Sequence, residues 1–149
     1  MIWKNITVSK THQLAVKSQT MELELEFVPN EGASGVRLAT DNSHFIEIGY
    51  DKKRQVLYID RSKAGSDDFN PSFTKLSRYE TTIAVRTDKT IKLRIFFDKS
   101  IVEVFANDGE AVMTAQIFPA ETATGVELFS TGKPAVFNSI KFYPLKPVW

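Results

Sequence analysis

Paired carboxylates are the side chains in this sequence whose chemistry is easiest to test. Two carboxyl groups about 5–5.5 Å apart cleave a glycosidic bond with retention of configuration, and a wider separation gives inversion. Asp67 is followed directly by Asp68, and Glu22, Glu24 and Glu26 alternate along one segment. Neighbouring loop residues point apart, and alternate residues of a strand share one face that is commonly solvated. We therefore expect turns and a solvated strand face rather than an acid–base pair.

Metal and nucleophile chemistry has little support in the sequence. The chain has no cysteine, which removes disulfides, thiolate nucleophiles, cysteine zinc sites and iron–sulfur clusters. Its two histidines, His12 and His44, do not fit a zinc-site pattern. The acidic loops Asp41-Asn42 and Asp67-Asp68 could supply oxygen ligands to Ca²⁺, but neither has EF-hand spacing, so plain turns are favoured. We expect neither a metal nor a cofactor.

Glu103 is the single charge whose position is most informative. Strand alternation places it on the same face as Ile101 and Phe105. A carboxylate buried on such a face needs a cationic partner to offset its lost hydration. We expect Glu103 to be mostly buried in a structural ion pair, with Arg61 or Arg94 as the partner. A solvated face and a ligand-binding role are the alternatives.

Length and charge limit the kind of protein further. A chain of 149 residues is the usual size of one domain, which we place at residues 1–149. Its 19 Lys and Arg residues nearly balance 18 Asp and Glu residues, without a sustained basic run. We therefore expect neither nucleic acid nor a membrane surface as a partner. The apolar stretches are too short for a membrane span, and the first residues lack the apolar block of a secretion signal.

The elements that must position these side chains are strands, because the apolar residues recur with a period of two. The clearest run is Met21–Phe27, where apolar residues alternate with glutamates. Asp108-Gly109 between two such runs predicts a hairpin, since glycine tolerates the positive φ of a tight turn. Regularly spaced short strands predict an all-β fold, a two-sheet antiparallel β-sandwich. Strands are predicted at 21–27, 45–50, 56–59, 82–85, 91–97, 101–105, 112–118, 126–129 and 136–142.

One run also resembles the signature of a known family. The segment Leu93–Glu110, which reads LRIFFDKSIVEVFANDGE, closely resembles the C-terminal β-sandwich domain of glycoside hydrolase family 32. Tyr58–Gly65 is similar to the DRS-x-x-G strand and loop of that family, and Ile117–Pro119 to its IFP motif. Gly125–Phe129 is similar to the next strand, and Trp149 resembles the point where such enzymes end. Lys99 is a departure, because an arginine is common after the aspartate.

The resemblance implies a partner domain and an absence of catalytic residues in this chain. The family contains levanases, inulinases, invertases and sucrose-6-phosphate hydrolases, whose catalytic carboxylates belong to an N-terminal five-bladed propeller. In the propeller these carboxylates lie in three motifs that resemble Asn-Asp-Pro-Asn, Arg-Asp-Pro and Glu-Cys. None of the three occurs in this chain, and Asp68-Phe69-Asn70-Pro71 is only superficially similar to the first. The expected role is a non-catalytic domain that stabilises the propeller of the same protein and could also pair two copies into a homodimer.

A carbohydrate-binding module is the alternative reading, because such sandwiches resemble the jelly rolls of legume lectins. Trp3, Tyr50, Tyr79 and Trp149 are candidate aromatic platforms for fructan or sucrose-type sugars, or interface residues. A domain that supports a propeller should instead expose a contiguous patch of apolar residues mixed with arginine. The resemblance fits two locations: extracellular if the parent is a levanase, and cytoplasmic if it is a sucrose-6-phosphate hydrolase.

Overall fold

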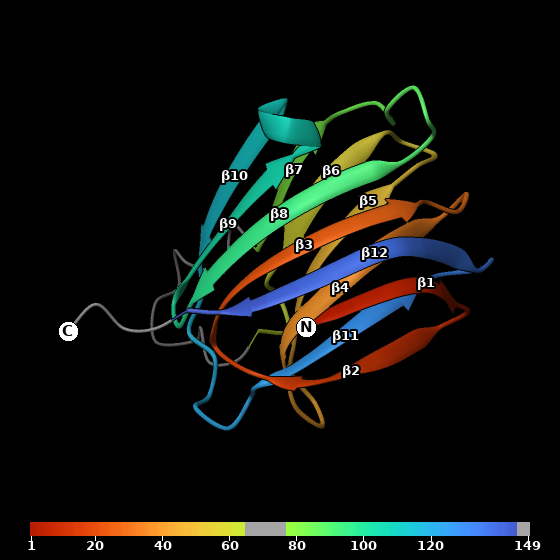
Figure 1. Cartoon of the computed structure of the whole chain (residues 1–149). Helices are drawn as coiled ribbons and strands as arrows, with labels where there is room; N and C mark the ends of the chain where they lie inside the picture. The colour runs from red at the N-terminus through yellow and green to blue at the C-terminus, as the bar shows by residue number, and fades with distance from the viewer. Residues whose placement is uncertain (65–76, 146–149) are drawn as a thin grey trace.

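Two antiparallel six-stranded sheets face each other in the computed structural model, which describes residues 1–64 and 77–145 (Figure 1). Sheet A has the strand order β1-β12-β3-β8-β9-β10, and sheet B has the order β2-β11-β4-β5-β6-β7. The predicted two-sheet β-sandwich is confirmed. The elements are β1 (Ile2–Val8), β2 (Thr11–Lys17), β3 (Thr20–Val28), β4 (Ala33–Thr40), β5 (Ile46–Asp51), β6 (Val56–Asp60), β7 (Arg78–Thr82), β8 (Ile91–Asp98), β9 (Ile101–Ala106), the 3₁₀ turn η1 (Asn107–Gly109), β10 (Ala111–Gln116), β11 (Gly125–Ser130) and β12 (Ala135–Pro144).

The core lies between the two sheets and is built by the alternation seen in the sequence. In β3 the four alternate apolar residues from Met21 to Phe27 are at most 1% exposed, while the glutamates between them face outward. Phe27 stacks on Phe137 of the neighbouring β12, with ring centroids 4.9 Å apart and planes 21° apart. Burying one such large apolar side chain contributes about 1.5–3 kcal/mol. The inner faces therefore hold the sandwich together, and the outer faces are left for other roles.

The predicted hairpin at Asp108-Gly109 is confirmed. Strands β9 and β10 pair through η1, and Asn107, Asp108 and Gly109 all have positive φ, at 49°, 60° and 95°. The Asn107 side chain anchors the turn: its Oδ1 accepts from the backbone N–H of Lys92 at 3.0 Å, and its Nδ2 donates to the carbonyl of Ala84 at 3.2 Å.

The strand predictions differ from the structure in two ways. Strands β1, β2 and β4 were not predicted: β1 and β2 are sheet edges with weak apolar alternation, and β4 contains Gly35. The predicted strand at 82–85 is wrong, because β7 ends at Thr82. Ile83 is buried for another reason. Its carbonyl accepts a hydrogen bond from the Tyr50 hydroxyl at 2.8 Å, so it closes the end of the core without continuing the strand.

A close approach between strands requires glycine at position 49. The Tyr58 ring on β6 lies over Gly49, and its hydroxyl donates to Glu47 Oε2 at 2.7 Å. A Cβ at position 49 would lie 2.6 Å from the Tyr58 hydroxyl oxygen and 2.9 Å from Cζ of Phe129. Burial raises the pKa of Tyr58 above its ordinary value, and the charge of Glu47 raises it further.

Replacing Gly49 by alanine should destabilise the fold. The added methyl group would overlap the rings of Tyr58 and Phe129, which leave no space for it. The free energy of unfolding should therefore fall by about 1–3 kcal/mol. Chemical denaturation checks this, with Lys4→Ala at an exposed position of β1 as the control, expected within about 0.5 kcal/mol of the parent. Equal effects of the two substitutions would contradict the packing described for Tyr58.

The chain should also lose stability above pH 10. The folded-state pKa values of Tyr58 and Tyr50 are raised above the ordinary tyrosine value of 10.0, mainly by burial. The folded protein therefore holds these protons more tightly than the unfolded chain, and the stabilisation is complete below pH 10 and is lost as pH rises further. Unfolding measured from pH 9 upward should show this loss, and Tyr58→Phe should flatten it. A slope unchanged in the variant would contradict the assignment.

Candidate functional site

The outer face of sheet A, on the side away from sheet B, carries a row of side chains that crosses all six strands. Cross-strand pairing places the members of this row directly opposite one another. The two edges of the row are apolar, and its middle is charged. The row runs Ile2, Lys141, Glu24, Arg94, Phe105 and Val112.

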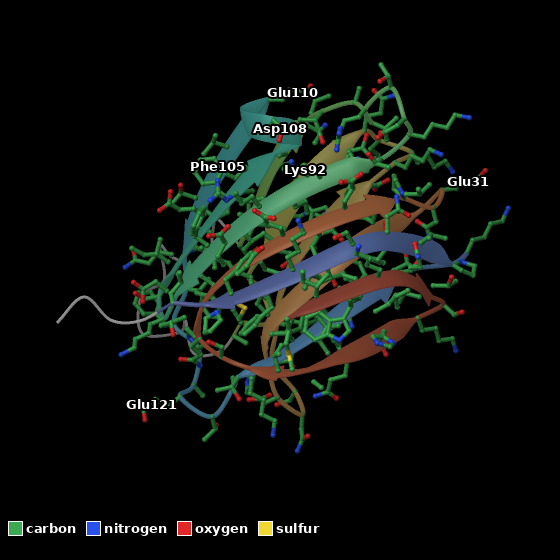
Figure 2. The ribbon with its side chains drawn as sticks, viewed as in Figure 1. Glu31, Lys92, Phe105, Asp108, Glu110 and Glu121 are labelled. Atoms are coloured by element: carbon green, nitrogen blue, oxygen red, sulfur yellow. The ribbon has the colours of Figure 1, made fainter. Side chains whose placement is uncertain are left out.

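A shallow hollow of about 550 Å³ adjoins this row near η1. Figure 2 shows Lys92, Phe105 and Asp108 at that end of the sheet with Glu110 beside them, whereas Glu31 and Glu121 lie at distant ends of the sandwich. Strands β3, β8 and β9 supply most of the lining and η1 closes one side. The lining residues are Glu24, Lys92, Arg94, Phe96, Phe105, Asp108 and Gly109.

The charges of this face are paired at its surface. Arg94 Nε donates to Glu22 Oε2 at 3.0 Å and lies 3.8 Å from Glu24 Oε1. Lys92 Nζ donates to Asp108 Oδ1 at 2.9 Å, and this hydrogen bond holds the pKa of Asp108 below its ordinary value. Because the Arg94, Lys92 and Asp108 side chains are 39–66% exposed, these ion pairs add little to the stability of the fold.

Aromatic rings lie beside these charges. Phe96 and Phe105 meet edge to face with centroids 5.8 Å apart, and the Arg94 guanidinium lies 5.0 Å from the centre of the Phe96 ring. The face thus combines exposed apolar surface with arginine, which is the composition expected of a surface that another domain covers.

Glu103 lies on this face but is not paired as predicted. It is half-buried, and its cross-strand neighbours are Phe96 and Thr114. Arg94 is two residues out of register with it and pairs with Glu22. Within residues 1–64 and 77–145 the structure gives Glu103 no ion pair, because its directly opposite neighbour on β8 is Phe96 and not Arg94.

Arg61 is buried elsewhere, 5% exposed. Its Nη1 donates to the backbone carbonyl of Gln116 at 2.6 Å, and its guanidinium lies 5.3 Å from the centre of the Tyr79 ring. Arg61 therefore links β6 to the end of β10 through a backbone group. Sequence reasoning found the two arginines but not their partners, which depend on strand register.

The candidate aromatic platforms are placed differently from the prediction. Tyr50 is 1% exposed and belongs to the core, which rules it out as a sugar platform. Trp3 and Tyr79 are half-buried and pack against the core. Trp149 lies outside the described residues. So do Asp67, Asp68 and the segment Asp68–Pro71, which is superficially similar to a propeller motif.

The acidic loop at Asp41 is a turn, as the sequence favours. Asp41 Oδ1 accepts the backbone N–H groups of Ser43 and His44 at 2.8 and 2.7 Å. The Ser43 hydrogen bond and then the His44 ring hold the pKa of Asp41 below its ordinary value. Across the described part of the chain, acidic and histidine side chains do not gather in threes as a metal ion requires. No helix in that part has the length and hydropathy needed to cross a bilayer.

Neutralising Glu103 should change stability little. Glu103→Gln removes a half-buried charge without an ion-pair partner among the described residues, so the free energy of unfolding should change by less than about 1 kcal/mol. Arg61→Met removes a buried guanidinium and its hydrogen bond to the Gln116 carbonyl, and it should cost about 1–3 kcal/mol. Denaturant unfolding of both variants tests the contrast. A larger loss for Glu103→Gln than for Arg61→Met would refute it.

Residues 2–144 match the family described as glycosyl hydrolases family 32 C terminal. The chain is 36% identical over 153 aligned residues to the levanase of Bacillus subtilis strain 168, covering 99% of this chain and 22% of that protein. It is 34% identical over 131 residues to the sucrose-6-phosphate hydrolase of Staphylococcus xylosus, covering 87% of this chain and 25% of that enzyme.

The fold is also that of solved enzymes. The crystal structure of exo-inulinase from Aspergillus awamori superposes with a TM-score of 0.88 at 27% identity, covering all of this chain and 29% of that one. In each comparison, this chain spans less than a third of the similar protein.

Proposed function

The chain belongs to the family of C-terminal domains of family 32 glycosyl hydrolases, and from this premise we propose that it is the non-catalytic β-sandwich of an enzyme that hydrolyses fructans or sucrose. In this role it packs against the N-terminal catalytic propeller of the same protein and stabilises it. The parent reaction is the hydrolysis of a β-fructofuranosyl bond, supported by relatives named levanase and sucrose-6-phosphate hydrolase.

The observation that carries the docking role is the uneven distribution of exposed apolar side chains. Among the described residues, every exposed large apolar side chain lies in a strand of sheet A or within two residues of one. The strands of sheet B contain none. These side chains are Met1, Ile2, Ile101, Val112, Phe118, Val136 and Tyr143.

A covering domain explains this asymmetry physically. Exposed apolar area on one face is stabilised when another surface removes it from water, and interfaces between domains of one chain cover about 600–1,500 Å². Arg94 and Lys92 supply polar contacts within the same face. The outer face of sheet A is therefore the docking surface for the catalytic domain.

Two copies of the chain could meet through the same face when the catalytic domain is absent. A self-complementary patch favours a two-fold dimer. Light scattering on the isolated chain tests this case. If the dimer forms, a substitution on the outer face of sheet A should change the mass of the particle from that of two chains to that of one. The two locations fitted by the relatives, extracellular and cytoplasmic, both permit the docking role.

Domain exchange tests the proposal. The chain replaces the matching region of the B. subtilis levanase, and Ile101 and Val112 are changed together to glutamate. The unsubstituted chimera should hydrolyse levan, whereas the chain by itself should release no reducing sugar. The double variant should lower the unfolding temperature of the chimera but leave that of the isolated chain nearly unchanged, because the two side chains are already exposed there.

The matched control changes Thr11 and Thr82, two exposed positions on sheet B, to glutamate. It should leave the chimera as stable as the parent. An equal loss for both double variants would overturn sheet A as the docking surface, and turnover by the isolated chain would overturn the non-catalytic role.

A further inference from the structure

The outer face of sheet B carries a row of polar side chains that also crosses six strands. Arg37 stands between the carboxylates Glu127 and Glu47 in this row, and these three side chains are only 17–24% exposed. Charged groups this far removed from water must be paired and held in place. The row runs Gln13, Glu127, Arg37, Glu47, Asp60 and Arg78.

Arg37 is the centre of this row and is fixed on several sides. Its Nε donates to Glu47 Oε1 at 2.9 Å, and its Nη1 donates to Glu127 Oε1 at 3.2 Å. The guanidinium carbon lies 4.5 Å from the centre of the Phe45 ring and 5.0 Å from that of Phe129. The Tyr58 hydroxyl occupies the second oxygen of Glu47. The orientation of the guanidinium is therefore set before any ligand arrives.

One donor and one acceptor of this network remain unused. Within the described part of the chain, Arg37 Nη2 and Glu127 Oε2 have no hydrogen-bond partner. They belong to one ion pair, whose Nη1 and Oε1 atoms are 3.2 Å apart, so a charged donor and a charged acceptor are carried by two contacting side chains. Two adjacent hydroxyl groups of a sugar match this arrangement, since each hydroxyl can both donate and accept. Hydrogen bonds to charged groups are also the stronger ones.

A hollow of about 740 Å³ opens over this ion pair, within the range of small-molecule sites, about 300–1,000 Å³. Its charged lining comprises three cations and two carboxylates, and Glu47 and Asp60 line the adjoining depression. This near balance favours a neutral, hydroxyl-rich ligand over an ion. Uncharged polar groups complete the rim: Gln13, Thr40, Asn42, Ser43, Thr122 and Thr124.

We propose that this hollow binds a fructosyl unit of a fructan chain, with Arg37 Nη2 and Glu127 Oε2 receiving two neighbouring hydroxyl groups. The choice of fructose among sugars rests on the proposed function; the hydroxyl recognition rests on the geometry. The site lies on the sheet opposite the docking surface, so it stays open when the catalytic domain is bound. The domain then holds the polymer near the enzyme as well as supporting it.

Calorimetric titration of the 149-residue chain with levan-derived and inulin-derived oligosaccharides tests the proposal. Saturable binding is expected, with malto-oligosaccharides binding much more weakly. Glu127→Gln removes the charged acceptor and should weaken fructan binding by about tenfold or more. Glu80→Gln is the matched control, because Glu80 lies on sheet B outside the hollow, and it should bind like the parent.

A second variant keeps the test decisive if Glu127→Gln does not fold. Thr122→Trp places a large ring on the exposed rim without touching the Arg37 network and should block the hollow, while thermal unfolding confirms that the variant is folded. Absence of fructan binding, binding unchanged by both variants, or equal binding of malto-oligosaccharides would each overturn the proposal. Because docking is measured on the chimera and binding on the chain alone, either can fail without the other.

Discussion

The constraint on which the structure depends is that each strand has two faces and one of them must be buried. The apolar residues of β3 and their counterparts in sheet B meet between the sheets, and within sheet A Phe27 of β3 stacks on Phe137 of β12. Once these side chains face inward, the register of each sheet decides which residues stand together outside. Both proposed functional surfaces are consequences of this alternation, since each is a row of outward residues aligned by strand pairing.

The two rows have different physical character. The row on sheet A ends in Ile2 and Val112, and its ion pairs are exposed and weak. The row on sheet B holds Arg37 between two carboxylates and two rings, largely out of water. A face with exposed apolar side chains at its edges suits a large protein partner that removes them from water, whereas a pre-organised polar face suits a small ligand rich in hydroxyl groups. The two proposed roles, support of a catalytic partner and binding of a polymer, therefore belong to opposite sides of one domain.

The sequence predicts those features that depend on local patterns. The alternation from Met21 to Phe27 and the turn at Asp108-Gly109 are local, and both appear in the structure. The pairing of Arg94 is not local: it pairs with Glu22 and not with Glu103, a contact set by the register of β3 against β8. Likewise Arg37 and Glu127 are 90 positions apart, so only the assembled sheet joins them. Tyr50 was a candidate surface ring because its sequence neighbours do not show which face of β5 is buried. In the assembled sandwich it lies on the buried face.

Family resemblance added what local patterns do not contain, namely the kind of protein to which the sandwich belongs. Hydroxyl-radical footprinting tests most directly whether sheet A is the face that the catalytic domain covers, by comparing side-chain oxidation in the isolated chain and in the levanase chimera. Ile101, Val112 and Tyr143 should react in the isolated chain and be protected in the chimera, while His12 on sheet B should react equally in both. Protection of His12 with unchanged reactivity of Ile101, Val112 and Tyr143 would contradict the account.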